Sequence, residues 1–260
     1  MRAALVFFTI GTAVFAATPD KALRVCADPN NLPFSNRSGQ GFENKIAETI
    51  ARELGEPVQY TWWPNKRNYP RNTLDAKRCD VILGVPADLG AALTTAPYYR
   101  SGYVAVYRKN SGLHIRSFDD PALRRLKLGV HLTDFDYTPP GISLTRRGIR
   151  NIVPFSLYGA NDQPNPPSQI IDAVADGRID VAFVWGPFAG YFAPRAKTPL
   201  EISPLPERDG LIPLAFAMSA ATRKSDASRN RDVQAALDKC KPEIRNILRQ
   251  YGVPLAGGGQ

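Results

Sequence analysis

The feature that most constrains the fold is a pattern that occurs twice, in which a helix end leads through an arginine and an aspartate into a buried strand. In the first half of the chain, Arg78 and Asp80 precede the apolar stretch 81–84, and in the second half Arg178 and Asp180 precede 181–184. Buried strands that alternate with helices form parallel sheets with right-handed crossovers. Two similar α/β lobes are therefore the simplest interpretation of this repeat.

Hydrophobic spacing predicts the individual elements of both lobes. The strands that we expect cover residues 23–27, 58–62 and 80–84 in the first lobe and 126–130, 150–155 and 179–184 in the second. Helices are expected over 42–54, 72–77 and 168–177, and again over 233–240 and 242–251 near the C-terminus. Two further strands, 103–107 and 213–218, flank the second lobe and are expected to connect the lobes.

The first 17 residues are typical of a secretory signal peptide. Arg2 precedes an apolar run over 3–15, and the small residues Ala16 and Ala17 stand before a polar stretch without a following lipid-anchoring cysteine. The run is shorter than the roughly 20 residues that span a bilayer. We therefore expect cleavage after Ala16 or Ala17, a soluble periplasmic protein, and no membrane insertion once the signal is removed.

The mature chain is expected to cross between its lobes twice. Residues 18–105 would form the first part of lobe I, 106–215 lobe II, and 216–260 the C-terminal part of lobe I. A chain of this kind carries a cleft where the carboxyl ends of the strands of both sheets meet. The arrangement is that of a binding protein whose lobes close on a ligand.

The charge of the chain is positive but scattered. The 33 Lys and Arg against 24 Asp and Glu give a net charge of +9, and because Arg2 is the one charge in the leader, about +8 remains after its removal. Acidic residues lie between the basic pairs, and we find no lysine-rich tail and no nucleic-acid motif. This pattern predicts a solvated surface with a bias toward acidic proteins and no nucleic-acid partner.

Three cysteines, Cys26, Cys79 and Cys240, remain in the mature chain. In an oxidising compartment they allow at most one intramolecular disulfide. Cys26 and Cys79 lie in or beside expected strands of one sheet, which makes them the candidate pair. The alternative is three buried thiols, since a free cysteine packs as a small apolar residue.

No motif of a known catalytic chemistry occurs in the sequence. There is no HExxH, P-loop, GxSxG or GxGxxG motif, and the two histidines, His114 and His131, stand in different contexts. Asp134 and Asp136 are too few ligands for a hard cation, so we expect neither a metal nor a cofactor. We expect a protein that is not an enzyme; a dehydratase that uses Asp28, His131 or Asp134 is the alternative.

Several segments together resemble family-3 solute-binding proteins. The stretch GFENKIA at 41–47 is similar to the first-helix motif of that family, and TTAPYYRSG at 94–102 is similar to the segment that enters its first hinge. The resemblance covers roughly residues 22–254. It implies the type II periplasmic binding protein fold, with two α/β lobes joined by a two-strand hinge.

A narrower set of segments resembles the MoxJ/XoxJ group, the solute-binding-like proteins associated with quinoprotein methanol dehydrogenases. The segments are 23–36, 60–64, 78–81, 84–86, 164–167 and 184–191. The resemblance implies a periplasmic accessory protein of PQQ-dependent methanol oxidation, which binds or activates the dehydrogenase or contacts its cytochrome c. The alternative is the substrate-binding receptor of an ABC transporter for a small solute that is not an amino acid.

Two departures from the amino-acid-binding pattern concern the ligand. Family-3 proteins clamp the α-carboxylate with an arginine after the third strand, but the stretch 85–93 contains no basic residue. They bind the α-ammonium with an acid at the position where this chain has Trp185. Because both charge-assisted contacts are missing, we expect either a ligand that is not an amino acid or a protein segment in the cleft.

The candidate cleft residues combine polar and aromatic side chains at the strand ends, which suits a ligand site. In lobe I they are Asp28, Asn30, Asn31, Phe34, Trp62, Trp63, Val85, Pro86, Thr95 and Tyr98. In lobe II they are His131, Thr133, Asp134, Trp185, Pro187 and Tyr191. One of Trp62 and Trp63 must face the core, since neighbouring side chains on a strand point in opposite directions.

Overall fold

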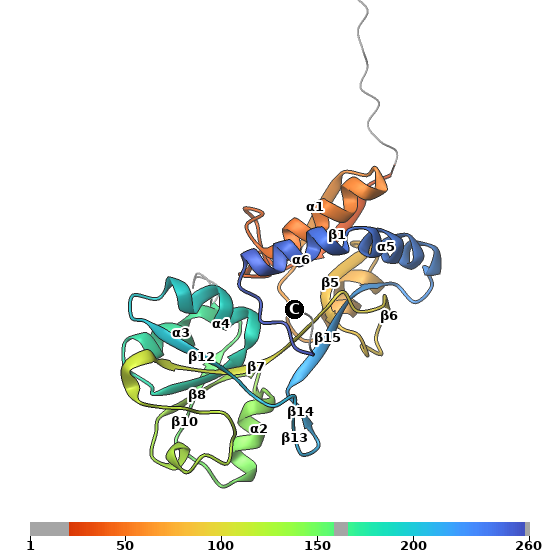
Figure 1. The fold of residues 1–260 in the computed structure, drawn as a ribbon. Helices are drawn as coiled ribbons and strands as arrows, with labels where there is room; N and C mark the ends of the chain where they lie inside the picture. The colour runs from red at the N-terminus through yellow and green to blue at the C-terminus, as the bar shows by residue number, and fades with distance from the viewer. Residues whose placement is uncertain (1–20, 159–165, 258–260) are drawn as a thin grey trace, which may run out of the picture.

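The computed structural model describes residues 21–158 and 166–257, and it divides into two α/β lobes that share one continuous sheet (Figure 1). The two-lobed α/β architecture expected from the repeat is confirmed. The expected signal peptide lies outside the described residues, as do residues 164 and 165 of the MoxJ/XoxJ-like segments. No helix within the described ranges is long and apolar enough to cross a membrane.

Lobe I is built on a parallel layer of three strands, in the order β4, β1 and β5, with β15 antiparallel to β5. Its elements are β1 (Leu23–Ala27), β2 (Asn30–Asn31), β3 (Ser35–Asn36), α1 (Phe42–Leu54), β4 (Val58–Trp62), β5 (Val81–Pro86), β6 (Leu93–Thr94), β15 (Ala215–Thr222), α5 (Ala227–Lys239) and α6 (Lys241–Gln250). Helix α1 ends at Gly55, whose φ of 68° suits a glycine after a helix. The C-terminal helices α5 and α6 both pack on α1.

Lobe II repeats this layout with β10, β8 and β11 in parallel and β7 antiparallel to β11. Its elements are β8 (Leu128–Thr133), β9 (Asp136–Tyr137), α2 (Pro139–Arg146), β10 (Ile152–Ser156), α3 (Gln169–Ala175), β11 (Val181–Trp185), α4 (Gly186–Phe192), β12 (Leu200–Pro204), β13 (Arg208–Asp209) and β14 (Ile212–Pro213).

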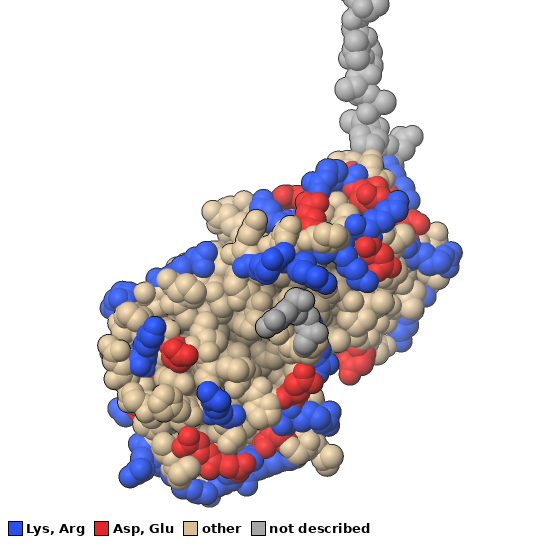
Figure 2. Space-filling model, in the orientation of Figure 1, with Lys and Arg blue, Asp and Glu red and all other residues tan. Residues whose placement is uncertain are grey.

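Charged side chains are scattered over both lobes. On the face shown in Figure 2, Lys and Arg are interspersed with Asp and Glu.

Strand β7 (Tyr99–Arg108) joins the two lobes because its two halves pair with strands of different lobes within the one sheet. Its first residues, 99–102, pair with β15, whereas residues 103–108 pair with β11 and β12. The return crossing runs beside it, and the backbone N–H of Tyr103 donates to the carbonyl of Leu214 at 2.7 Å. The hinge is thus two adjacent, hydrogen-bonded segments of chain.

The repeated Arg–x–Asp pattern has the same structural role in both lobes. The backbone N–H of Asp80 donates to a carbonyl at the start of β1 at 2.8 Å, and that of Asp180 donates to the carbonyl preceding β8, also at 2.8 Å. Before each arginine the backbone turns through the left-handed region, at Lys77 (φ 56°) and at Gly177 (φ 73°). Each aspartate therefore starts the third strand of its lobe beside the first one.

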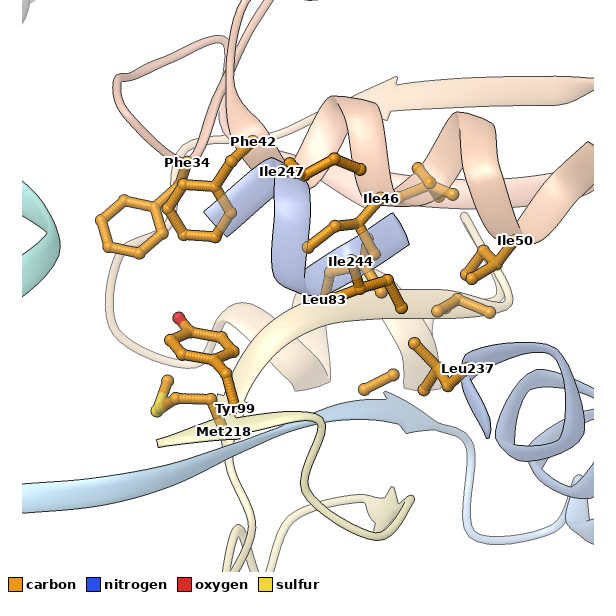
Figure 3. Close-up of a cluster of buried hydrophobic side chains, with 14 of the residues drawn as sticks. Phe34, Phe42, Ile46, Ile50, Leu83, Tyr99, Met218, Leu237, Ile244 and Ile247 are labelled. Atoms are coloured by element: carbon orange, nitrogen blue, oxygen red, sulfur yellow. The ribbon is translucent and has the colours of Figure 1, made fainter. Parts of the chain in front are cut away.

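The core of lobe I lies between the sheet and helices α1, α5 and α6 (Figure 3). Helix α1 contributes Phe42, Ile46 and Ile50, and α6 contributes Ile244 and Ile247. The sheet closes this cluster from below with Leu83, Tyr99 and Met218. Because Phe42 is fully buried in the first turn of α1, the core fixes the start of this helix beside the ends of the strands.

A smaller cluster on the other face of the lobe I sheet surrounds a disulfide. Cys26 of β1 is bonded to Cys79, with the two Cα atoms 5.5 Å apart, and both side chains are buried. Cys240, at the junction of α5 and α6, is free and partly exposed.

Several element boundaries differ from those expected from the sequence, and helices α2 and α4 were not expected. The helix expected over 72–77 is a single turn over Arg71–Asp75, the first connecting strand starts at Tyr99, and the second runs on to Thr222. The added residues include Ser101 and Ser219, which interrupt an apolar pattern. Pairing between the two connecting strands, and of β15 with β5, extends both strands beyond their hydrophobic stretches.

Candidate functional site

A cavity of about 430 Å³ lies where the strand ends of the two lobes meet. Lobe I and the β15 strand contribute Asp28, Pro29, Asn30, Asn31, Phe34, Glu43, Pro64, Asn65, Lys66, Leu83, Gly84, Pro86, Phe216 and Met218 to its wall. Lobe II and the β7 strand contribute Tyr103, Pro139, Leu157, Tyr158, Trp185 and Phe188. The cavity has the size of a small-molecule site, and its wall is mainly apolar and aromatic with a few polar groups.

Six of the candidate cleft residues line this cavity. They are Asp28, Asn30, Asn31, Phe34, Pro86 and Trp185. They come from the loop after β1 and from the ends of β5 and β11. Strand ends of both lobes therefore supply these six residues, as the sequence pattern predicts.

The two neighbouring tryptophans of lobe I lie elsewhere. Trp62 stacks on Tyr60 with ring centroids 4.7 Å apart, and the guanidinium of Arg37 lies 5.8 Å from its ring. Trp63 packs in the cluster around the disulfide, with the guanidinium of Arg78 at 4.6 Å. One of the two therefore faces the core, as the alternation along a strand requires, and neither lines the cavity.

Three further lobe I candidates lie behind the cavity wall. Val85 is buried in the cluster around the disulfide, on the opposite face of β5 from Gly84. The hydroxyl of Thr95 is buried and accepts a hydrogen bond from the backbone of Ala220 at 3.0 Å. The hydroxyl of Tyr98 accepts a hydrogen bond from the backbone N–H of Gly84 at 3.0 Å. Tyr98 therefore supports the floor of the cavity without lining it.

His131 is buried rather than directed into the cavity. Its ring meets that of Phe188 edge-on at 5.5 Å, and its Nε2 has no hydrogen-bond partner among the described residues. Burial lowers the pKa of His131 to about 4, so the imidazole is neutral at pH 7. Of the three residues named for a dehydratase, Asp28 lines the cavity, whereas His131 and Asp134 do not.

The remaining lobe II candidates surround the cavity at a greater distance. Thr133 and Asp134 belong to the hairpin between β8 and β9, and Pro187 is buried in the first turn of α4. Tyr191 stacks on Tyr251 of the C-terminal segment with ring centroids 5.8 Å apart. Its position therefore contributes to the contact between α4 and the end of the chain.

Glu43 is the principal cavity residue that the sequence reasoning missed. It stands in the first turn of α1, which begins directly after Gly41, where a Cβ would lie 2.0 Å from the carbonyl oxygen of Phe34. The carboxylate lies over Gly84, where a Cβ would meet its Oε1 at 1.8 Å. Burial, and secondarily repulsion from Asp28, raises the pKa of Glu43 to about 8. The signal in the sequence was an acid that follows the β1 loop in a Gly-Phe-Glu stretch.

The two acids in the cavity differ in how they are bonded. Both oxygens of Asp28 accept hydrogen bonds from backbone N–H groups, Oδ1 from Asn30 at 2.8 Å and Oδ2 from Asn65 at 2.6 Å. No hydrogen bond joins the Glu43 carboxylate to another residue within the described ranges. Asp28 therefore holds two loops together, whereas Glu43 is left for a ligand.

Aromatic rings from both lobes form the apolar wall. The ring of Trp185 lies 5.4 Å from that of Tyr103 and 5.8 Å from that of Phe216, while Phe34 meets Phe188 edge-on at 5.2 Å. The sequence reasoning included Phe34 and Trp185 but missed the other three. Tyr103 and Phe216 sit on the connecting strands, which a search of strand ends does not reach.

The cavity wall contains no arginine among its described residues, and Lys66 is its one basic side chain. The described wall therefore offers no guanidinium to clamp an α-carboxylate, and Trp185, the residue expected in place of an ammonium-binding acid, lines the cavity. No group of three or more metal-binding side chains occurs in the parts of the chain that the structure describes.

Comparison with known proteins relates the chain to one group. It is 34% identical over 258 residues to Protein MoxJ of Methylorubrum extorquens, covering 94% of this chain and 85% of that protein. It matches the crystal structure of the periplasmic binding protein XoxJ from Methylobacterium extorquens AM1 with a TM-score of 0.75 and 35% identity, over 91% of this chain and 100% of that one.

Two further comparisons concern the fold. The crystal structure of MxaJ from Methlophaga aminisulfidivorans matches with a TM-score of 0.77 and 27% identity, over 90% of this chain and all of the other. An ancestral cationic amino acid solute-binding protein is 21% identical with a TM-score of 0.68, which shows a shared fold alone. No protein-family model matches the chain.

Proposed function

We propose, from the premise that this chain belongs to the MoxJ/XoxJ family of periplasmic binding proteins, that it is a periplasmic accessory protein of PQQ-dependent methanol oxidation. In this proposal the protein binds a quinoprotein methanol dehydrogenase, or its cytochrome c, through the cleft and its rims. It performs no chemistry of its own. The fold of a solute receptor is used for contact with a protein.

The observation that carries this proposal is the composition of the cleft. Trp185, expected from the sequence at the position where an amino-acid receptor has an acid, lines the cavity, and the described wall contains no arginine for a carboxylate. Five aromatic rings from both lobes are grouped there instead. Aromatic side chains are enriched among the residues that dominate protein–protein binding energies, which supports a protein segment as occupant.

An exposed phenylalanine beside the cleft adds to this surface. Phe135 is 98% exposed at the tip of the β8–β9 hairpin, between two aspartates. Burial is the main cause of the raised pKa of Tyr158, which lines the cavity, and the charges of Asp134 and Asp28 add to it. Asp134, the neighbour of Phe135, is therefore close enough to Tyr158 to place the hairpin near the rim. A fully exposed aromatic ring at a hairpin tip is suited to insertion into a partner surface.

The proposal is tested by pull-down from periplasm at low and moderate salt. The bait proteins are the wild type, Trp185→Ala and, as a matched control, Trp62→Ala, which removes an indole outside the cavity. We expect the wild type and the Trp62 variant to capture dehydrogenase or cytochrome and the Trp185 variant to lose it. Capture of neither by the wild type at either salt, with a small molecule retained in the cleft, contradicts the proposal.

The second candidate function is a receptor that delivers a small solute to an ABC transporter. The ligand-sized cavity of about 430 Å³ is the observation that favours it. Neighbouring genes separate the two functions, since a permease and an ATPase accompany a receptor, whereas a quinoprotein dehydrogenase and a cytochrome c accompany the accessory protein.

A further inference from the structure

Glu43 is an acid that lines the cavity and has no described partner for its carboxylate. The carboxylate of Glu43 lines the cavity, and no hydrogen bond or ion pair joins it to another described residue. An ionised group that is removed from water without a partner is costly, so proteins usually pair such groups or neutralise them. The space beside Glu43 is large enough for a small molecule to supply the missing partner.

None of the titratable groups that face Glu43 can act as a positively charged partner for its carboxylate, so a cation would have to come from a ligand. They are Asp28 from the loop after β1, Tyr60 of β4, Tyr69 near the helical turn over 71–75, and Tyr98 and Tyr99 at the start of β7. All of these are neutral or negative at pH 7. Lys66 lines the same cavity but is solvent-exposed, and it forms no ion pair with either acid among the described residues.

The wall around the acid is apolar. Leu83 and Met218 flank Gly84 on the sheet side, and Phe34, Trp185, Phe188 and Phe216 line the rest. Such a wall gains free energy from a hydrocarbon group and attracts a cation through the faces of its rings. One acid with an aromatic and aliphatic surround matches a molecule with one positive group and an apolar body.

We propose that the cavity binds a primary organic ammonium ion, whose NH₃⁺ group donates hydrogen bonds to the Glu43 carboxylate while its hydrocarbon part packs against the aromatic wall. This goes beyond the accessory function, because it concerns a small ligand and needs no dehydrogenase. The absence of an arginine from the described wall excludes tight binding of the carboxylate of an amino acid, so the ligand class is amines rather than amino acids.

Binding of this kind is linked to a proton. With a pKa of about 8, Glu43 holds a proton in the empty cavity at pH 7. When the ammonium ion binds, the carboxylic acid gives up that proton to solvent and the resulting carboxylate pairs with the cation. The site is neutral before binding, as a carboxylic acid, and neutral afterwards, as an ion pair. One positive charge enters with the ligand and one proton leaves. Affinity therefore rises with pH as pH approaches 8, while the ligand itself stays protonated.

The test uses purified mature protein and three probes with the same six-carbon chain: hexylammonium, 1-hexanol and hexanoate. Isothermal titration at pH 7 is expected to show hexylammonium binding tightest and hexanoate weakest. Glu43→Gln keeps the shape of the side chain and should weaken hexylammonium at least tenfold while leaving 1-hexanol unchanged, which also shows that the cavity is intact. Glu48→Gln, an exposed acid one turn further along α1, is the matched control and should bind as the wild type does.

Two readouts decide the proposal. Titrations in buffers of different ionisation enthalpy are expected to show proton release at pH 7 that disappears at pH 9, where Glu43 is already ionised. Hexylammonium that binds no better than 1-hexanol, or equally well to the Glu43 variant, overturns the ammonium site. Because no dehydrogenase is present in this experiment, its failure leaves the pull-down result untouched, and the reverse also holds.

Discussion

A Cβ on residue 84 would lie 1.8 Å from Oε1 of Glu43, so the glycine on β5 and the acid on α1 share one space. The backbone at Gly84 also has a φ of 63°, in the left-handed region that side chains rarely adopt. The floor of the cavity therefore depends on the absence of a side chain at this position.

Gly84→Ala is predicted to lower the free energy of unfolding by about 1–2 kcal/mol, the cost of a left-handed residue with a Cβ. A Cβ at residue 84 would meet the far end of the flexible Glu43 side chain, which is expected to move away and to lower the affinity for hexylammonium. Gly90→Ala is the control, because a Cβ there meets nothing within 4 Å. Urea unfolding measures the stability change. Equal stabilities of the two alanine variants would contradict a cost of the left-handed backbone at residue 84.

The stability of the empty protein should fall as pH rises from about 4.5 to about 8. Glu43 has its pKa raised from 4.5 to about 8 on folding, so the folded state keeps a proton that the unfolded state releases. Its favourable contribution is complete below pH 4.5 and is lost as pH rises through 8. Glu43→Gln removes this pH dependence, so its free energy of unfolding should rise relative to wild type by roughly 1–3 kcal/mol between pH 5 and pH 8. A pKa difference is worth about 1.4 kcal/mol per unit, and the expected gain is smaller than the full value because the side chain is exposed to the cavity. Parallel stability curves for the two proteins would contradict a buried acid.

The ion pair between Arg229 and Glu56 is predicted to be important for lobe I. Both side chains are 6% exposed, the Nη1–Oε1 distance is 2.9 Å, and Arg229 lowers the pKa of Glu56. Arg229→Ala leaves the buried Glu56 carboxylate with only the exposed Lys21, 3.4 Å away, as a described ion-pair partner, and should cost about 3 kcal/mol. Arg52→Ala breaks the exposed pair with Glu243 and should change stability little, because water and salt screen that pair. Thermal or urea unfolding compares the two, and similar losses would contradict the difference in burial.

The disulfide between Cys26 and Cys79 closes a loop with a sequence separation of 53. Denatured, unreduced protein is expected to expose one titratable thiol, that of Cys240, and reduced protein three. Replacing both bonded cysteines by alanine should lower stability by about 2–5 kcal/mol, because the unfolded chain gains freedom. Cys240→Ala is the control and should change stability little. Three thiols in the unreduced protein would show that the pair is not bonded.

The elements of the fold could be predicted from the sequence because their signals are local. The spacing of Phe42, Ile46 and Ile50 indicates helix α1, and Gly55 marks its end. The repeat at Asp80 and Asp180 identifies two similar lobes because each aspartate starts the third strand of its own sheet. These patterns predict an element without information on the elements that pack against it.

The site was predictable only where a loop or strand end determines it. Trp185 ends β11 and lines the cavity, whereas Trp62 ends β4 but turns onto Tyr60, since strand alternation alone does not say which face is the cleft. Glu43 was missed because an acid in the first turn of a helix is ordinarily explained by the helix dipole. Its role depends on Gly84, which lies 41 positions away in the chain and meets it only through tertiary packing.

Binding of a dehydrogenase through the cleft can be measured by titrating purified quinoprotein methanol dehydrogenase against the immobilised mature protein. We predict saturable binding for the wild type, a loss of about 2 kcal/mol, or roughly thirtyfold in Kd, for Trp185→Ala, and a change of less than about twofold for Trp62→Ala. Saturable binding that Trp185→Ala leaves unchanged, or no binding by the wild type at low salt, would contradict a function through the cleft.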